Sequence, residues 1–99
     1  MSPPRILLVE DEQNLARALK LNLSLEGYEV AHAATAREAG RLMVDPTGFD
    51  AILLDVQLPD VDGFTFCERL REAGDYTPVL MLTARNAPED RVAGLEAGA

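Results

Sequence analysis

The chain has 99 residues, 47% of them hydrophobic and only 5% aromatic, which suits one small domain with a mainly aliphatic core. Its 17 acidic and 9 basic residues give a formal net charge of −8, which argues against nucleic-acid binding by this segment because no basic surface offsets phosphate charge. No apolar stretch has the length of a membrane span or the form of a signal peptide, so we expect a cytoplasmic location without membrane contact.

The first predicted elements are a strand over residues 5–9 and a helix over residues 13–26. The strand is a short aliphatic run, which is typical of a strand buried on both faces. The helix has an apolar face at helical spacing, and Gly27 follows where a left-handed residue commonly ends a helix. The leucines that define the face are Leu15, Leu19 and Leu23, widened by Ala18, Leu21 and Leu25.

A second strand is predicted over residues 28–33, followed by a helix that ends near Val44. Thr35 is a suitable N-cap for this helix, and Glu38 three residues later completes the pattern of a capping box. Asp45 precedes a proline, and the residue before proline disfavours helical geometry.

The third strand is predicted over residues 49–54, a loop over 56–62 and a helix over 63–73. The side chains expected to face inward from this helix are Phe64, Cys67 and Leu70. A fourth strand over residues 78–82 and a last helix over 88–97 complete the series. Alternation of strands and helices predicts a doubly wound α/β sheet of parallel strands, with the flavodoxin-like order 2-1-3-4.

Acidic residues follow two of the predicted strands. Glu10 and Asp11 end the first strand, and Asp55 ends the third. In the order 2-1-3-4 these strands are neighbours, so the carboxylates converge at the sheet edge where such folds bind ligands. Oxygen ligands in a wet site suit Mg²⁺, and a carboxylate beside this ion can attack phosphorus. Thr83, at the end of the fourth strand, is placed to hydrogen-bond a phosphoryl oxygen.

Three segments together resemble the receiver domain of bacterial two-component response regulators. They are RILLVEDE at residues 5–12, DVQLPDVDG at 55–63 and PVLMLTA at 78–84, in the order and spacing of that family. The resemblance covers essentially the whole chain. It implies a phosphoprotein of a signalling phosphorelay rather than an enzyme, one that assists only its own phosphoryl transfer and hydrolysis.

The resemblance implies a role for each matching residue. Asp55 corresponds to the phosphoacceptor, which takes a phosphoryl group from a sensor histidine kinase. Asp11 corresponds to the main Mg²⁺ ligand and Glu10 to the second acid, while Gln57 would offer its backbone carbonyl to the metal. Thr83 corresponds to the switch hydroxyl. Three further positions have supporting roles, in access to the aspartate and in the shape of the loop: Ala84, Pro59 and Gly63.

The family continues beyond the matching segments with a fifth strand, a lysine followed by proline, and a fifth helix. We therefore expect residues 1–99 to form a receiver domain that is incomplete at its C-terminal side, without a second domain. The only lysine, Lys20, lies midway along the first predicted helix and cannot replace the family lysine. An unpaired edge on the fourth strand also predicts self-association.

Two alternatives are weighed against the phosphoacceptor. One is a receiver-like interaction module that is not phosphorylated. The other is a phosphatase of the haloacid dehalogenase type, which also uses an aspartate at a strand end with Mg²⁺. That family has a second aspartate two residues after the first, whereas this chain has Gln57 there.

Overall fold

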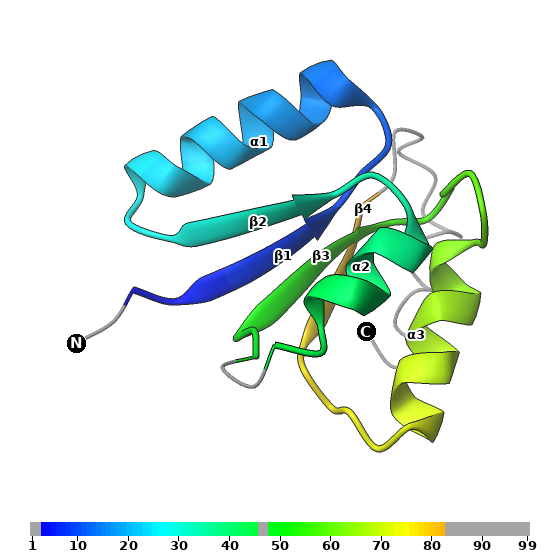
Figure 1. Cartoon of the computed structure of the whole chain (residues 1–99). Helices are drawn as coiled ribbons and strands as arrows, with labels where there is room; N and C mark the ends of the chain where they lie inside the picture. The colour runs from blue at the N-terminus through cyan, green and yellow to red at the C-terminus, as the bar shows by residue number, and fades with distance from the viewer. Residues whose placement is uncertain (1–2, 46–47, 83–99) are drawn as a thin grey trace.

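The computed structural model describes residues 3–45 and 48–82 of the chain. Strands and helices alternate through this part, as the sequence predicts (Figure 1). The elements are β1 (Arg5–Val9), α1 (Gln13–Leu25), β2 (Glu29–Ala33), α2 (Ala36–Leu42), β3 (Ala51–Asp55), α3 (Gly63–Glu72) and β4 (Val79–Leu82). The helix predicted over residues 88–97 lies outside the described residues.

The strands form one parallel sheet in the order β2-β1-β3-β4. This order confirms the predicted doubly wound arrangement, in which the chain reverses its direction of winding between β1 and β3. The register pairs Val9 with Ala33 on one side and with Leu54 on the other. The carboxyl ends of β1 and β3 therefore lie next to each other.

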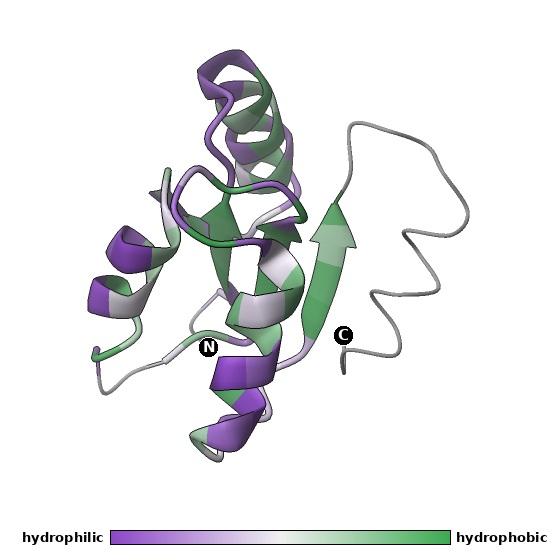
Figure 2. Ribbon diagram, turned by 90° about the vertical axis from the view of Figure 1, so that its right-hand side faces the viewer, coloured by the Kyte–Doolittle hydropathy of each residue, from purple (hydrophilic) through white to green (hydrophobic). Residues whose placement is uncertain are grey.

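Helices cover both faces of the sheet (Figure 1). One face packs against α2 and α3, and its buried cluster is mainly aliphatic, as the composition predicts; it includes Leu7, Val9, Ile52, Leu54, Ala39, Phe66 and Cys67. The other face carries α1, and Ile6 and Leu8, which alternate with Leu7 and Val9 along β1, are buried on this side. The strands are hydrophobic along most of their length, while each helix alternates between hydrophobic and hydrophilic residues (Figure 2). None of the described helices is long and apolar enough to cross a membrane.

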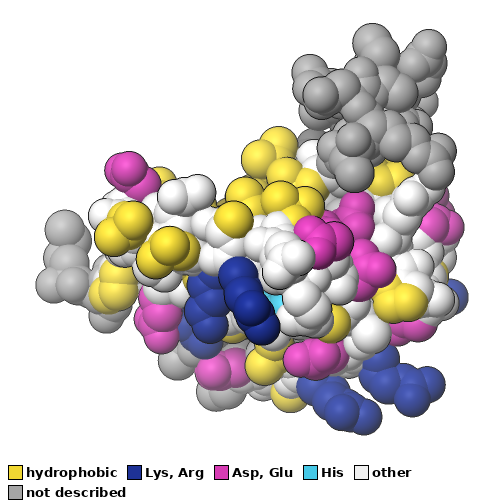
Figure 3. Space-filling model, turned by 90° about the horizontal axis from the view of Figure 1, so that it is seen from above, with side chains coloured by type: hydrophobic (Ala, Val, Ile, Leu, Met, Phe, Trp, Pro, Cys, Tyr) yellow, Lys and Arg dark blue, Asp and Glu magenta, His cyan; other side chains and the backbone are white. Residues whose placement is uncertain are grey.

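The apolar face predicted for α1 is only partly buried. Ala16 is the buried residue of this helix, whereas Leu21 and Leu25 are 61% and 75% exposed. Figure 3 shows hydrophobic side chains at the surface, among charged ones, on the side of the molecule that carries α1. The structural reason is that α1 lies over β2, at the edge of the sheet, so only part of its leucine face meets the sheet among the described residues (Figure 1).

Side-chain caps begin the helices. The Thr35 hydroxyl accepts a hydrogen bond from the Glu38 N–H at 3.0 Å, which confirms the predicted cap of α2. The Glu38 carboxylate returns to the N–H of Ala34 at 3.3 Å, one residue before the position a capping box prescribes. The carboxylate of Glu12 caps α1, and that of Asp62 caps α3.

Two details of the prediction are wrong. In α3 the side chain of Phe66 is buried beside Cys67, whereas Phe64 is only half-buried. The third strand begins at Ala51 rather than at residue 49, and the two residues before it contact Arg5. The Arg5 N–H donates to the Asp50 carboxylate at 2.7 Å, and its guanidinium lies 4.7 Å from the ring centre of Phe49.

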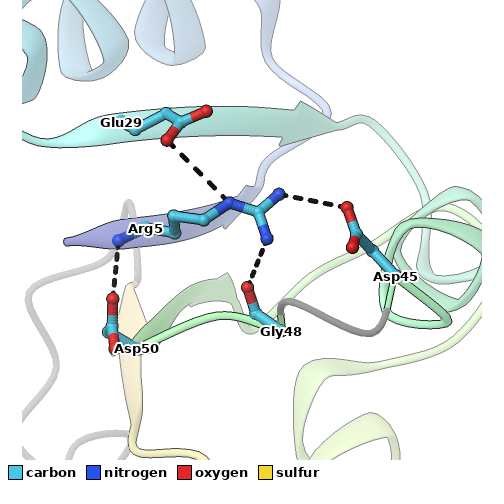
Figure 4. Close-up of polar contacts among 5 residues, drawn as sticks. All are labelled: Arg5, Glu29, Asp45, Gly48 and Asp50. Carbon is cyan, nitrogen blue, oxygen red and sulfur yellow. Dashed lines mark hydrogen bonds and ion pairs between the residues drawn. The ribbon is translucent and has the colours of Figure 1, made fainter. Parts of the chain in front are cut away.

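Arg5 links three parts of the chain at the amino end of the sheet (Figure 4). Its guanidinium donates to the carbonyl oxygen of Gly48 at 2.6 Å and lies 3.4 Å from the carboxylate of Asp45. Its Nε is 4.0 Å from the carboxylate of Glu29 on β2. These contacts fasten the α2–β3 connection to β1, at the opposite end of the sheet from the acidic strand ends.

Candidate functional site

The three predicted carboxylates meet at the carboxyl end of the sheet. Glu10 and Asp11 directly follow β1, and Asp55 is the last residue of β3, the neighbouring strand. Each residue offers one carboxylate oxygen, and these oxygens all lie within 4.8 Å of one another. The convergence predicted from the sequence is therefore present in the structure.

Two of these carboxylates are buried. Glu10 is 3% exposed and Asp55 9%, while Asp11 is exposed to solvent. Burial, followed by the negative charge of Asp55, raises the pKa of Glu10 from 4.5 to about 7. Burial also raises the pKa of Asp55. When no cation is bound, the carboxylate cluster thus retains a proton more readily than three isolated carboxylates would.

Backbone and side-chain hydrogen bonds orient both buried acids. The Glu12 N–H donates to Glu10 Oε1 at 3.2 Å, and the Gln57 N–H donates to Asp55 Oδ1 at 3.2 Å. His32 on β2 donates from Nε2 to the backbone carbonyl oxygen of Glu10 at 2.7 Å. Glu10, at the end of β1, is therefore held by His32 of the neighbouring strand and by the backbone of Glu12, the N-cap of α1.

The loop between β3 and α3 forms one wall of the site. It opens a cavity of about 330 Å³ lined by the acids and by Gln57, Leu58 and Pro59. Gly63 begins α3 and donates its N–H to the carbonyl oxygen of Val56 at 2.7 Å. A Cβ at Gly63 would overlap the carbonyl oxygen of Asp55, so only glycine allows the helix to start this close to the strand.

The donor set fits a hard divalent cation. It consists of oxygen atoms, one of them on an exposed carboxylate, in a cavity open to water. A cation would also remove the electrostatic cost that raises the two pKa values, because it offsets the negative charge that the buried carboxylates share. The arrangement can therefore bind a metal ion and present an oxygen of Asp55 as a nucleophile.

The remaining predicted residues are Thr83 and Ala84, which lie outside the described residues. The strand before them ends at Leu82, which pairs with Asp55, and its carbonyl oxygen accepts a hydrogen bond from the Val56 N–H at 3.0 Å. The carboxyl end of β4 is thus adjacent to the carboxyl end of β3.

Two residues near the site were not assigned a role from the sequence. His32 contacts the backbone carbonyl of Glu10, 22 positions away, and pairs with Leu8 in the strand register, which only the structure shows. Asp60 accepts hydrogen bonds from the N–H groups of Ala36 and Arg37, both at 3.0 Å, at the start of α2. No sequence pattern joins residues so far apart, so Asp60 could not have been found in advance.

The fold and the acidic site are those of a response regulator receiver domain. The model of this family, described as "Response regulator receiver domain", matches residues 6–99, and the chain belongs to this family. The chain is therefore a signalling domain of two-component signal transduction.

Named relatives agree with this assignment. The chain is 50% identical over 99 residues to the transcriptional regulatory protein TcrA of Mycobacterium tuberculosis, covering 100% of this chain and 39% of TcrA. It thus spans about two fifths of the length of that relative. Among solved structures, the chemotaxis response regulator CheY4 of Vibrio cholerae is similar with a TM-score of 0.87 and 35% identity, covering 98% of this chain and 82% of that chain. The non-phosphorylated HemR receiver domain of Leptospira biflexa gives a TM-score of 0.82 and 42% identity, covering 97% and 77% of the two chains.

Proposed function

We propose that this receiver domain accepts a phosphoryl group on Asp55 from a sensor histidine kinase, with Mg²⁺ at the acidic site. The observation that carries the proposal is the meeting of Glu10, Asp11 and Asp55 within 4.8 Å at the mouth of an open cavity. A cytoplasmic location is part of this proposal.

Asp55 is the proposed nucleophile. One of its carboxylate oxygens forms a bond to phosphorus while the bond between phosphorus and a kinase imidazole nitrogen breaks. The electron pair of the broken bond stays on the imidazole, and Asp55 becomes an acyl phosphate. The hydrogen bond from the Gln57 N–H to Oδ1 holds the carboxylate, so that the other oxygen can attack.

The proposed metal ligands are Asp11, Asp55, the backbone carbonyl of Gln57 and Glu10, the last directly or through water. A bound Mg²⁺ would supply positive charge that offsets the carboxylates and the transferring phosphoryl oxygens. The buried position of Glu10 keeps its charge close to the others, and the exposed position of Asp11 leaves room for metal-bound water.

Four further residues complete the proposal. Thr83 is proposed as the hydroxyl that hydrogen-bonds the phosphoryl group, and Ala84 as the small residue that leaves access to it. Pro59 lines the cavity, and Gly63 allows α3 to begin against the backbone of Asp55. These two residues are proposed to maintain the loop rather than to take part in the transfer.

Phosphorylation of the chain by a small acyl phosphate in the presence of Mg²⁺ tests the proposal. We expect a hydroxylamine-labile phosphoryl group on the chain, absent from Asp55→Asn and retained in Glu68→Gln, which changes an exposed acid of α3. Label that persists in Asp55→Asn would exclude Asp55 as the acceptor. Repeated turnover of many phosphoesters would favour a phosphatase, and a folded chain that binds no label would favour a module that is not phosphorylated.

A further inference from the structure

A groove lies between α2 and α3, on the face of the sheet away from α1. The two helices are neighbours on this face (Figure 1). The cavity measures about 680 Å³, roughly twice the volume of the cavity at the acidic site. Its floor is formed by the buried core residue Phe66 and by partly buried side chains that pack against the core, namely Met43, Val61 and Leu70. Val44, two residues after α2, is 81% exposed at the rim of the groove.

Two arginines stand on opposite walls of the groove. Arg37 belongs to α2 and Arg69 to α3, and both side chains are exposed. Among the described residues, neither guanidinium has a hydrogen bond or an ion pair. Most of the described basic side chains are likewise exposed without such a partner, Arg17, Lys20 and Arg41 among them, so the position of Arg37 and Arg69 beside an apolar groove is what distinguishes these two. The groove therefore holds two cations whose charge the described fold does not use.

The two acids of the groove are already engaged. Both oxygens of Asp60 accept N–H groups at the start of α2. Oδ1 of Asp75 accepts from the N–H and the hydroxyl of Thr77, at 3.0 and 2.6 Å. Asp60 thus uses both carboxylate oxygens within the fold and Asp75 uses one of its two, whereas both guanidinium groups are available to a partner, which favours a ligand with carboxylates.

Gly40 lines the groove from the α2 side. It lies inside the helix, where glycine is the least favourable residue after proline. Its φ is not positive, and a Cβ built on it meets no atom of the described residues within 4 Å. The local backbone and packing therefore do not require glycine here, and a large side chain at this position would occupy part of the groove that Gly40 lines.

We propose that the α2–α3 groove binds an amphipathic helix of a partner protein, with apolar side chains flanked by carboxylates. The apolar side chains would cover the floor of the groove, and the carboxylates would pair with Arg37 and Arg69 from either side. The surface is distinct from the phosphorylation site, so the inference does not depend on Asp55. It assigns a second interaction surface to the domain.

A displayed peptide library tests this proposal. The peptides carry apolar residues at helical spacing, with glutamate and lysine in equal proportion at the flanking positions, and are selected on the full chain. We expect glutamate to be enriched about tenfold over lysine. Selection on the double variant Arg37→Glu/Arg69→Glu should reverse this preference.

Variants that fill the groove complete the test. Gly40→Leu places a large side chain in open space, and we expect it to weaken the selected peptides at least about tenfold. Ala18→Leu adds the same side chain to the exposed surface of α1 and should leave binding unchanged. Thermal unfolding of each variant verifies that it is folded.

Three results would overturn the proposal. They are no enrichment of glutamate over lysine, binding that Gly40→Leu leaves intact, and a dimer in sedimentation that Gly40→Leu abolishes. The last result would assign the groove to a second copy of the chain instead of a partner protein.

Discussion

Asp60 accepts a hydrogen bond from the backbone N–H of Ala36 at 3.0 Å, and so ties the loop after β3 to the first turn of α2. Its second oxygen accepts from the N–H of Arg37, also at 3.0 Å. These bonds lower the pKa of Asp60 because they stabilise the ionised carboxylate. One wall of the acidic site is therefore connected to the helix that borders the α2–α3 groove.

Loss of the Asp60 bonds should lower thermal stability in two steps. We expect the melting temperature to fall in Asp60→Asn, which keeps one good acceptor, and to fall further in Asp60→Ala, which keeps none. Because the pKa is lowered, the stabilisation is present above the unfolded value of 3.8 and is lost as the pH falls through the folded value. Melting curves at neutral and strongly acidic pH measure this, with Glu68→Ala as the control. The melting temperatures of Asp60→Ala and the native chain should differ less at strongly acidic pH than at neutral pH. An equal difference at both pH values would show that the ionised carboxylate does not cause it.

Gly63 and Gly40 should respond in opposite ways to the same substitution. In Gly63→Ala the new methyl group meets the backbone of Asp55 and Val56, so α3 must shift, at a cost of about 1–3 kcal/mol in the free energy of unfolding. Gly40→Ala meets no described atom and should stabilise the chain by about 0.5–1 kcal/mol. Denaturant titration of both variants gives the two free energies. Equal effects would mean that the contact at Gly63 does not restrict the residue.

The metal-free chain should lose stability as the pH rises from about 5 to 8. The pKa of Glu10 is raised from 4.5 to about 7 in the folded state. Between these two pH values the folded chain therefore binds more protons than the unfolded chain. The free energy of unfolding therefore decreases with pH, by on the order of 3 kcal/mol for a group shifted this far.

Mg²⁺ and a neutral side chain should each remove this decrease. Mg²⁺ offsets the charge that the proton would otherwise neutralise, and Glu10→Gln removes the charge itself. We expect Glu10→Gln to be more stable than the native chain at pH 8 without metal, and to gain less from Mg²⁺. Urea titrations with Mg²⁺ and with a chelator measure both effects. A flat pH profile of the metal-free native chain would contradict the raised pKa.

Self-association through β4 remains a prediction. Among the described residues, β4 pairs only with β3, and Leu80 on this strand is 61% exposed. A strand edge with apolar side chains tends to pair with another chain. Sedimentation of the 99-residue chain should show association that increases with concentration and is reduced in Leu80→Lys. A monodisperse monomer at high concentration would rule this association out.

Much of the acidic site was predictable because it depends on local patterns. The runs before Glu10 and Asp55 indicate buried strands, and their alternation with helices implies a parallel sheet in which these strand ends are neighbours. The cap at Thr35 was predictable for the same reason, since the cap and its partner are three residues apart. The burial of Phe66 in place of Phe64 was not, because the rotation of α3 is set by its contact with β3 through Gly63.

The sequence by itself determined the order of elements, the parallel sheet and the identity of the clustered acids, since each follows from periodicity and strand-end chemistry. Only the tertiary structure decided how deeply Glu10 is buried, that His32 holds its backbone, and that Asp60 reaches α2. These features join residues more than twenty positions apart, and their geometry depends on how the layers pack. Local pattern carries no information about such distances, which is why the pKa of Glu10 and the groove beside Gly40 emerged only from the folded chain.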